Sequence, residues 1–434
     1  MIRTAILMLA LATTGFSSCP AAAQQEQPIM ATQNSPMEIR AEQVVALLNG
    51  KVEPADIFTP AFRAAVADAQ IKALSASLTA QFGPAEAVAL LAPREGTRAA
   101  LEIRFARGIA KGGIAIDPAQ DNRINELRFT AVEALVMADD TAEKIAADLT
   151  ALPGTVNAWF GPLDGGKPVI SIGAQMPLAL GSTFKLYVLA ALAEDVKAGR
   201  RKWADVVPLS EKSFPSGQLQ DWPANSPVTL HTLASLMIAI SDNTATDQLI
   251  TELGKDCILK LMADSGHRDP GANDPFLTTR ELFLLKASDP QIVAAWKSED
   301  AADNAAAQSA LAMSEMTVAD ISAAFANGPK ALDIEWFASP DDLAKLFAHM
   351  RRTADPKAFE IMTINPSATP AIKENWAYIG YKGGSEPGVL NLTWLLTDKT
   401  GRDHVLTLGW NNAAAVLDDG KLEALAQRIL LLSR

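Results

Sequence analysis

A serine and a lysine three residues apart open a long apolar stretch, and this pair constrains the chain more than any other feature. Ser182 and Lys185 lie in the segment Gly181-Ser-Thr-Phe-Lys-Leu-Tyr-Val-Leu-Ala-Ala-Leu192. Residues three apart share one face of a helix, so a lysine amine kept neutral by desolvation can take the proton of the serine hydroxyl. The spacing predicts a nucleophile and its base. The alternative is a helix N-cap serine beside a solvated lysine.

Two further segments follow this pair in the chain. Ser241-Asp-Asn243 comes after residues 233–240, which have helical apolar spacing, and Lys382-Gly-Gly384 comes after the strand-like residues 376–381. The order S-x-x-K, S-D-N, K-[ST]-G is the signature of class A β-lactamases and penicillin-binding proteins. From residue 140 onward the chain therefore resembles a class A β-lactamase-like serine hydrolase.

The resemblance implies a role for each matching residue. Ser182 attacks an acyl carbonyl, Lys185 acts as general base, and Ser241 relays a proton to the leaving group. The N–H groups of Ser182 and Ser385 bind the oxyanion. The predicted catalytic residues are Ser182, Lys185, Ser241 and, as a candidate, Glu281, and the predicted substrate-binding residues are Asn243, Lys382, Gly383, Gly384 and Ser385.

The third motif departs from the family pattern at its middle position. Gly383 lacks the hydroxyl that helps to bind a substrate carboxylate in the family, so we expect altered carboxylate recognition. A literal Lys399-Thr-Gly401 also occurs, but it lies in a charged segment between two strand-like runs. That setting predicts an exposed hairpin turn rather than a cleft.

A second departure concerns hydrolysis of the acyl-enzyme. Class A β-lactamases carry an E-x-x-x-N segment after S-D-N, and no such pattern appears in the expected place. Glu281 is the nearest candidate for a water-activating base. Its alternative is a solvent-facing helix residue paired with Arg280 or Lys286. The resemblance therefore implies an acyl-enzyme that turns over slowly.

The pattern of apolar residues predicts an α+β fold in two parts. In the first, residues 38–138, helix-like segments (39–48, 60–66 and 71–82) precede strand-like ones (85–91, 99–107, 113–116 and 122–130). This order resembles the steroid-isomerase-like or cystatin-like cones attached to β-lactamase-like proteins of clavam biosynthesis clusters. In the second, residues 140–434, the resemblance implies an antiparallel sheet flanked by helices, with an all-helical lobe over the middle residues, 228–352.

The first residues predict export. Residues 1–23 combine a basic start, an apolar run and a small-residue cleavage site, which is typical of a secretory signal peptide. A lipoprotein site at Cys19 is the alternative, and a membrane span is excluded by length. Residues 24–37 are polar and read as a disordered tether. A periplasmic or secreted protein is expected.

Composition narrows the chemistry and the partners. The net charge of −12 disfavours nucleic acid and anionic membranes. The four histidines have no metal-ligand spacing, so we expect neither metal nor cofactor. The predicted function is an exported hydrolase of β-lactams or related amides and esters, with a small-molecule substrate and an unassigned oligomeric state. The alternatives are a D-Ala-D-Ala carboxypeptidase or esterase, and a non-catalytic β-lactam-binding protein.

Overall fold

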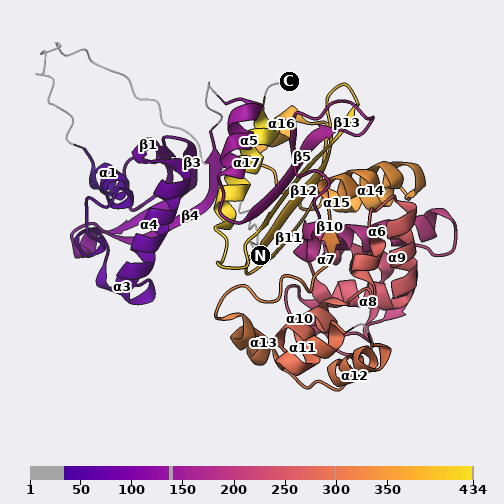
Figure 1. Cartoon of the computed structure of the whole chain (residues 1–434). Coiled ribbons are helices and arrows are strands. Elements are labelled where there is room, and N and C mark those ends of the chain that lie inside the picture. Colours follow the sequence, from indigo (N-terminus) through magenta and orange to yellow (C-terminus); the bar gives the residue numbers. More distant parts are fainter. Residues whose placement is uncertain (1–33, 136–139, 299, 433–434) are drawn as a thin grey trace, which may run out of the picture.

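The computed structural model describes residues 34–135, 140–298 and 300–432. Figure 1 shows two parts joined after β4, each with its own sheet. The predicted signal peptide and most of the predicted tether lie outside the described residues. The tether prediction is wrong at its end, because Ser35 caps a helix that already begins at Pro36 and buries Met37.

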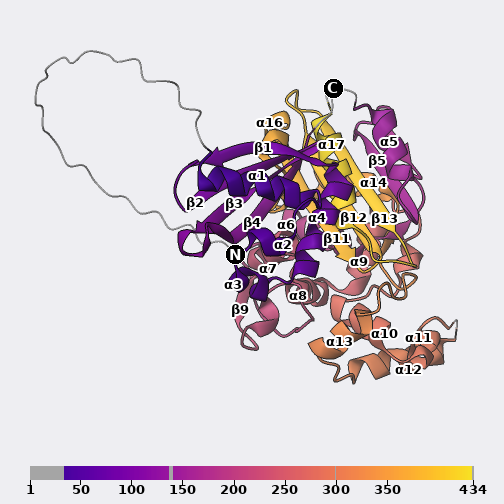
Figure 2. The ribbon, with the colours of Figure 1, turned by 90° about the vertical axis from the view of Figure 1, so that its left-hand side faces the viewer.

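The N-terminal part consists of helices followed by strands, in the predicted order. One four-stranded antiparallel sheet has the order β1-β2-β3-β4, and the long helices α1 and α4 pack with it around one core, as Figure 2 shows. Its elements are α1 (Pro36–Leu48), α2 (Pro54–Ile57), α3 (Pro60–Ala65), α4 (Asp68–Phe82), β1 (Ala85–Ala92), β2 (Arg98–Phe105), β3 (Gly108–Asp117) and β4 (Arg123–Ala134).

Strand β3 is much longer than the predicted residues 113–116. The pairing register shifts between Lys111 and Gly112. The partner changes from Ala131 to Phe129, so the extra residue is Thr130 on β4. A Cβ atom at Gly112 would lie 1.8 Å from the carbonyl oxygen of Arg128, so only glycine fits opposite the bulged strand β4. The first half of β3 was missed because its glycines and Lys111 give too few apolar side chains to show a period of two.

The C-terminal part is built on a five-stranded antiparallel sheet of order β11-β12-β13-β5-β6. Helices α5, α16 and α17 share an apolar core with one face, and α14 and α15 contact β5, β11 and β13 on the helical side of the sheet. The elements at this sheet are α5 (Ala142–Thr150), β5 (Thr155–Pro162), β6 (Ile170–Ile172), α14 (Pro340–Thr353), α15 (Lys357–Met362), α16 (Pro370–Asn375), β11 (Tyr378–Glu386), β12 (Val389–Thr397), β13 (Asp403–Asn411) and α17 (Asp419–Leu431).

The predicted helical lobe is present, with α7 to α13 between β9 and β10 and with α6 contributed from an earlier part of the chain. Its core surrounds α6, where every residue from Lys185 to Ala193 is buried. Its elements and the short strands beside it are β7 (Leu178–Ala179), α6 (Lys185–Lys197), β8 (Val206–Pro208), β9 (Pro227–Thr229), α7 (Leu230–Ala239), α8 (Asn243–Leu253), α9 (Lys255–Asp264), α10 (Thr279–Ala287), α11 (Pro290–Trp296), α12 (Ala301–Ala312), α13 (Val318–Phe325) and β10 (Phe337–Ala338). The structure thus confirms the predicted α+β class.

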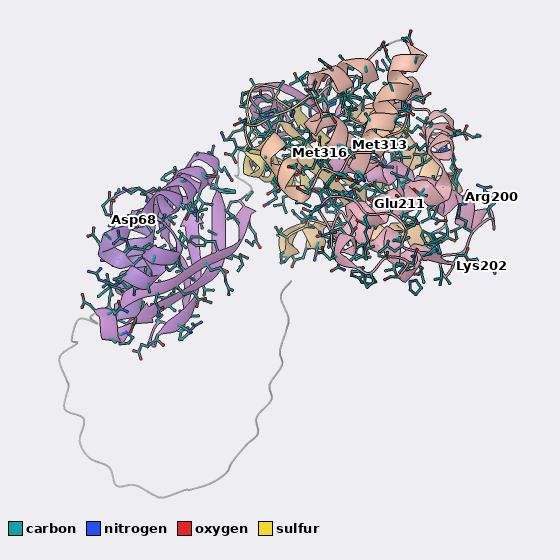
Figure 3. The ribbon with its side chains drawn as sticks, turned by 90° about the horizontal axis from the view of Figure 1, so that it is seen from below. Asp68, Arg200, Lys202, Glu211, Met313 and Met316 are labelled. Atoms are coloured by element: carbon teal, nitrogen blue, oxygen red, sulfur yellow. The ribbon has the colours of Figure 1, made fainter. Side chains whose placement is uncertain are left out.

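The two parts touch through α17. The Gln81 side chain of α4 donates to Asp418 Oδ1 at 2.8 Å, and the Ala134 N–H of β4 donates to Gln427 Oε1 at 2.7 Å. Figure 3 shows the parts side by side, with Asp68 on the N-terminal one and Met313 and Met316 on the helical lobe. Within the three described ranges, we find no helix with the length and apolar character needed to cross a membrane.

Candidate active site

The predicted nucleophile lies on a tight turn that leads into the most buried helix. Residues Gly181–Phe184 form one turn of 3-10 helix, and α6 begins at Lys185. Over residues 181–193, all of which the structure describes, Ser182 alone is not buried. The turn thus exposes a single hydroxyl from an otherwise inaccessible segment, one helical turn from Lys185.

The Lys185 amine is fully buried and surrounded by oxygen atoms of the second motif. Its Nζ lies 2.6 Å from Asn243 Oδ1, 2.8 Å from the Ser241 carbonyl oxygen and 3.1 Å from Ser241 Oγ. A neutral amine has two hydrogens and one lone pair, and the Ser241 hydroxyl can act as either donor or acceptor. Two donated bonds and one accepted bond therefore satisfy an uncharged Lys185.

Burial is also the main cause of a low pKa at Lys185. Desolvation, followed by the positive charge of Lys382, lowers the pKa of Lys185 well below its usual value, against the opposing effect of Asp247 and Asp242. A lowered pKa favours the uncharged form of the amine, which is the form that can accept a proton. The environment thus favours the protonation state that a general base needs.

The second motif keeps its shape through Asp242. Its carboxylate caps α8 by accepting from the Ala245 N–H at 2.9 Å, and it also accepts from the N–H groups of Gln218 and Leu219. Ser241 adopts a left-handed conformation with φ of 58°, which turns the chain sharply between α7 and α8. The loop therefore holds Ser241 and Asn243 facing Lys185.

Lys382 reaches the same place from the sheet. Its Nζ lies 3.2 Å from Ser241 Oγ and also donates to the Gly383 carbonyl oxygen. Desolvation lowers the pKa of Lys382 to about 7. The three sequence motifs, from α6, the α7–α8 loop and β11, thus meet at one serine hydroxyl.

The backbones of the first and third motifs are in direct contact. A Cβ atom at Gly384 would lie 2.3 Å from the Ser182 nitrogen, and one at Gly181 would lie 3.0 Å from the Ser385 nitrogen. Only glycine permits this approach. The amides of Ser182 and Ser385 therefore lie on abutting segments, as two oxyanion donors require.

The missing hydroxyl at Gly383 has a steric explanation. A Cβ atom there would lie 2.1 Å from the hydroxyl of Tyr381 on the same strand. Tyr381 is packed against Trp394 with ring centroids 4.6 Å apart, and burial raises the pKa of its phenol. The Tyr381 side chain occupies the space that a serine or threonine would need.

The structure does not bring Glu281 into contact with these motifs. Its carboxylate receives the Lys255 amine at 2.6 Å and the Thr278 N–H at 2.7 Å, as the N3 residue of a capping box on α10. The ion pair expected with Arg280 or Lys286 is replaced by one with Lys255 of α9. Both oxygens of Glu281 are therefore engaged away from Ser182.

Sequence reasoning missed a buried carboxylate, Asp247. It lies one turn after Asn243 on α8 and accepts from the N–H groups of Thr279 and Arg280 at 2.7 and 2.9 Å. Burial raises its pKa to about 6. The spacing of four residues from Asn243 could have placed Asp247 on the same face of the helix as the site. Its burial could not be foreseen, because the residues of α10 that bind it are remote in the sequence.

Two further features, the Lys399-Thr400-Gly401 segment and the arrangement of metal-binding side chains, bear on the predicted chemistry. The Lys399-Thr400-Gly401 segment is the exposed turn between β12 and β13, where Asp398 accepts from Thr400, and the prediction of a hairpin turn is confirmed. Among the residues that the structure describes, no group of three or more His, Cys, Asp or Glu side chains is arranged to hold a metal ion.

Comparison with solved structures gives similar chains of low identity. One is PBP-A, with 19% identity and a TM-score of 0.47, where the match covers 67% of this chain and 94% of that one. Another is a beta-lactamase from Sphaerobacter thermophilus, with 22% identity, a TM-score of 0.46 and the same two coverages. A third is the putative class A beta-lactamase PenP from Rhodopseudomonas palustris, with 14% identity and a TM-score of 0.46, where the match covers 67% of this chain and 97% of that one. No curated protein matches the chain.

The family comparison covers most of the C-terminal part. The model described as the beta-lactamase enzyme family (Beta-lactamase2) matches residues 140–427. This range contains Ser182, Lys185, Ser241 and Lys382, and it begins just after the N-terminal sheet. The chain belongs to the beta-lactamase enzyme family.

Proposed function

We propose that this protein is an exported serine hydrolase that forms an acyl-enzyme on Ser182 with β-lactams or related amides and esters. The observation that carries the proposal is the convergence of two buried amines, those of Lys185 and Lys382, on the hydroxyl of Ser241. Burying two amines side by side is costly, and such perturbed groups gather at functional sites.

The proposed acylation step follows from these contacts. Lys185 takes the proton of Ser182 as Ser182 Oγ bonds to the substrate carbonyl carbon, and the carbonyl oxygen becomes an oxyanion facing the N–H groups of Ser182 and Ser385. The carbonyl C–N bond of a lactam, or the C–O bond of an ester, then breaks. The leaving atom takes a proton from Ser241, which regains one from Lys185.

Lys382 and Asn243 bind the substrate in this proposal. Lys382, when protonated, attracts a substrate carboxylate, and the Asn243 amide orients both the substrate amide and Lys185, to which it is hydrogen-bonded. Gly383 contributes no hydroxyl. Carboxylate binding therefore depends on Lys382 more than it does in proteins with serine or threonine at that position.

Slow deacylation makes a penicillin-binding type of activity the second candidate. The observation that favours it is the engagement of both Glu281 oxygens by Lys255 and Thr278, which leaves the predicted water-activating base occupied. A D-Ala-D-Ala carboxypeptidase or esterase uses the same acylation groups. Fast hydrolysis of a D-Ala-D-Ala peptide together with a long-lived penicillin adduct would favour this candidate.

Mass spectrometry of the intact protein after incubation with penicillin G tests the proposal. We expect a covalent adduct that maps to the peptide containing Ser182 and is absent in Ser182→Ala. Reversible binding of penicillin without any adduct, measured by calorimetry, would instead indicate a non-catalytic binding protein. An adduct on another residue would contradict the assignment of the nucleophile.

Export is part of the proposal and rests on residues 1–23 of the sequence. We expect the mature protein in the periplasm or the medium, beginning near residue 24. Fractionation of cells followed by N-terminal sequencing measures this. Recovery with the membranes, carrying lipid on Cys19, would establish the lipoprotein alternative, and an unprocessed cytoplasmic protein would contradict export.

A further inference from the structure

A second buried charge cluster lies beside the proposed oxyanion hole. Lys286 of α10 forms ion pairs with Glu335, which precedes β10, at 2.8 Å and with Glu386, the last residue of β11. The side chains of Lys286 and Glu335 are completely buried, and that of Glu386 is 6% exposed. The cluster therefore joins three segments that are far apart in the sequence.

The charges of the cluster do not balance when all three groups are ionised. One ammonium faces two carboxylates, and an excess charge is costly in a buried place. Burial, followed by the nearby Glu335 carboxylate, raises the pKa of Glu386 to about 8. Near neutral pH Glu386 therefore holds a proton, and the cluster is neutral.

Both glutamates are sequence neighbours of residues that contact the nucleophile turn, which comprises Leu180 and the 3-10 turn Gly181–Phe184. Glu386 directly follows Ser385, whose nitrogen abuts Gly181. Glu335 directly precedes Trp336, whose carbonyl oxygen accepts from the Leu180 N–H at 3.0 Å.

Trp336 also fixes the far side of the turn. Its ring stacks on Phe184 with centroids 3.6 Å apart, and its Nε1–H donates to the Leu277 carbonyl oxygen at 3.1 Å. Lys286 thus ties together the two supports of the nucleophile turn, one through Trp336 and one through Ser385.

We propose that Lys286, Glu335 and Glu386 are positioning residues that set the spacing of the two oxyanion donors, and that the cluster must be electrically neutral for fast acylation. This inference rests on the proposed function. A net negative charge on the cluster repels the two carboxylates from each other and opposes the oxyanion that develops beside Ser385. The neutral cluster does neither.

The other charged groups near the cluster are accounted for. Lys297 pairs with Asp333 and, together with the more distant charge of Lys286, lowers the pKa of Asp333, so Asp333 stays ionised throughout the relevant range. Lys382, with a pKa of about 7, loses its proton, and with it its positive charge, at lower pH than Glu386 loses the proton that keeps it neutral. A change above about pH 8 therefore reports on the cluster.

The test measures Ser182 acylation by an uncharged p-nitrophenyl ester, so that carboxylate binding by Lys382 does not enter. The burst rate of the full-length protein is recorded from about pH 7 to about pH 9.5. We expect the wild-type rate to fall by at least about tenfold over this range. In Glu386→Gln and Glu335→Gln, one carboxylate balances Lys286, so both variants should lack this fall.

A control exists at a more exposed cluster that also joins one cation to two carboxylates. Arg428 of α17 pairs with Asp140 and Asp148, and Asp148→Asn removes one carboxylate there, as Glu386→Gln does in the Lys286 cluster. Asp148→Asn should keep the wild-type profile, including its alkaline fall. A purely structural role for Glu386 predicts a lower rate at every pH, with a lower melting temperature and an unchanged profile.

The outcomes separate this inference from the proposed function. A wild-type profile without an alkaline fall, or a fall that persists in both glutamine variants, overturns the inference while the adduct on Ser182 stands. Absence of any Ser182 adduct with both the ester and penicillin G overturns the proposed function, and the inference with it. Loss of the fall in both folded glutamine variants, but not in Asp148→Asn, supports the inference.

Discussion

Lys185 and Lys382 contact the same oxygen atom, Ser241 Oγ, at 3.1 and 3.2 Å. They come from the start of α6 and from β11, which are far apart in the sequence. Two ammonium groups at this separation repel each other in a place that also excludes water. This proximity is the reason why Lys382 adds to the effect of burial on the pKa of Lys185.

Replacing Lys185 with arginine should remove the base while keeping a cation. A guanidinium stays protonated, so it cannot take the Ser182 proton. We expect the acylation rate to fall by about 10²–10⁴-fold. The matched control is Lys197→Arg at the exposed end of the same helix, which should acylate at the wild-type rate. Near-normal acylation of Lys185→Arg, measured by the penicillin burst, would refute the assignment.

Substrates with a carboxylate should lose their advantage as pH rises. Because the pKa of Lys382 is lowered to about 7, its charge is present below this pH and lost above it. We expect kcat/KM for a penicillin, relative to a neutral ester, to decline above about pH 7. In Lys382→Met the ratio should be low at every pH. A ratio that does not change with pH in the wild type would exclude charge attraction by Lys382.

Alanine at Gly384 should disrupt the contact between the first and third motifs. Its Cβ would lie 2.3 Å from both the Ser182 nitrogen and the Leu180 carbonyl oxygen, so β11 and the nucleophile turn must separate. We expect a loss of about 1–3 kcal/mol in the free energy of unfolding, measured by urea denaturation, and loss of acylation.

Gly113→Ala on β3 is the matched control for this substitution. Its Cβ would lie 3.4 Å from the Ala99 carbonyl oxygen, an ordinary contact, so stability should change little. Full acylation of Gly384→Ala would show that the close approach of the two backbones is not needed for the oxyanion hole.

Glutamine at Glu281 should affect stability rather than turnover. The substitution weakens the pair with Lys255, which is about one third exposed, and the capping box of α10. We expect a loss of about 1 kcal/mol in the free energy of unfolding. The lifetime of the penicillin adduct should match that of the wild type. A much longer lifetime would mean that Glu281 activates the hydrolytic water after all.

Local patterns in the sequence predicted most of the elements. Apolar spacing of three and four residues indicated the long helices, and alternation indicated the strands of the N-terminal sheet. β3 was predicted too short because Gly108, Lys111 and Gly112 leave too few apolar side chains in its first half to show alternation. The first helix was predicted to begin at residue 39 rather than at Pro36, because its cap, Ser35, lies inside a polar segment that is otherwise typical of a tether.

The sequence by itself determined the three motifs, the family resemblance and the residue types that the chemistry requires, because these depend on spacing within one helix, one loop and one strand. Only the tertiary structure decided which groups share a site. Contacts between distant segments bury Lys185 and Lys382 and form the Lys286 cluster. Such a contact also forms the ion pair between Glu281 and Lys255. Desolvation and charge pairing are properties of the packed chain, so no local pattern encodes them.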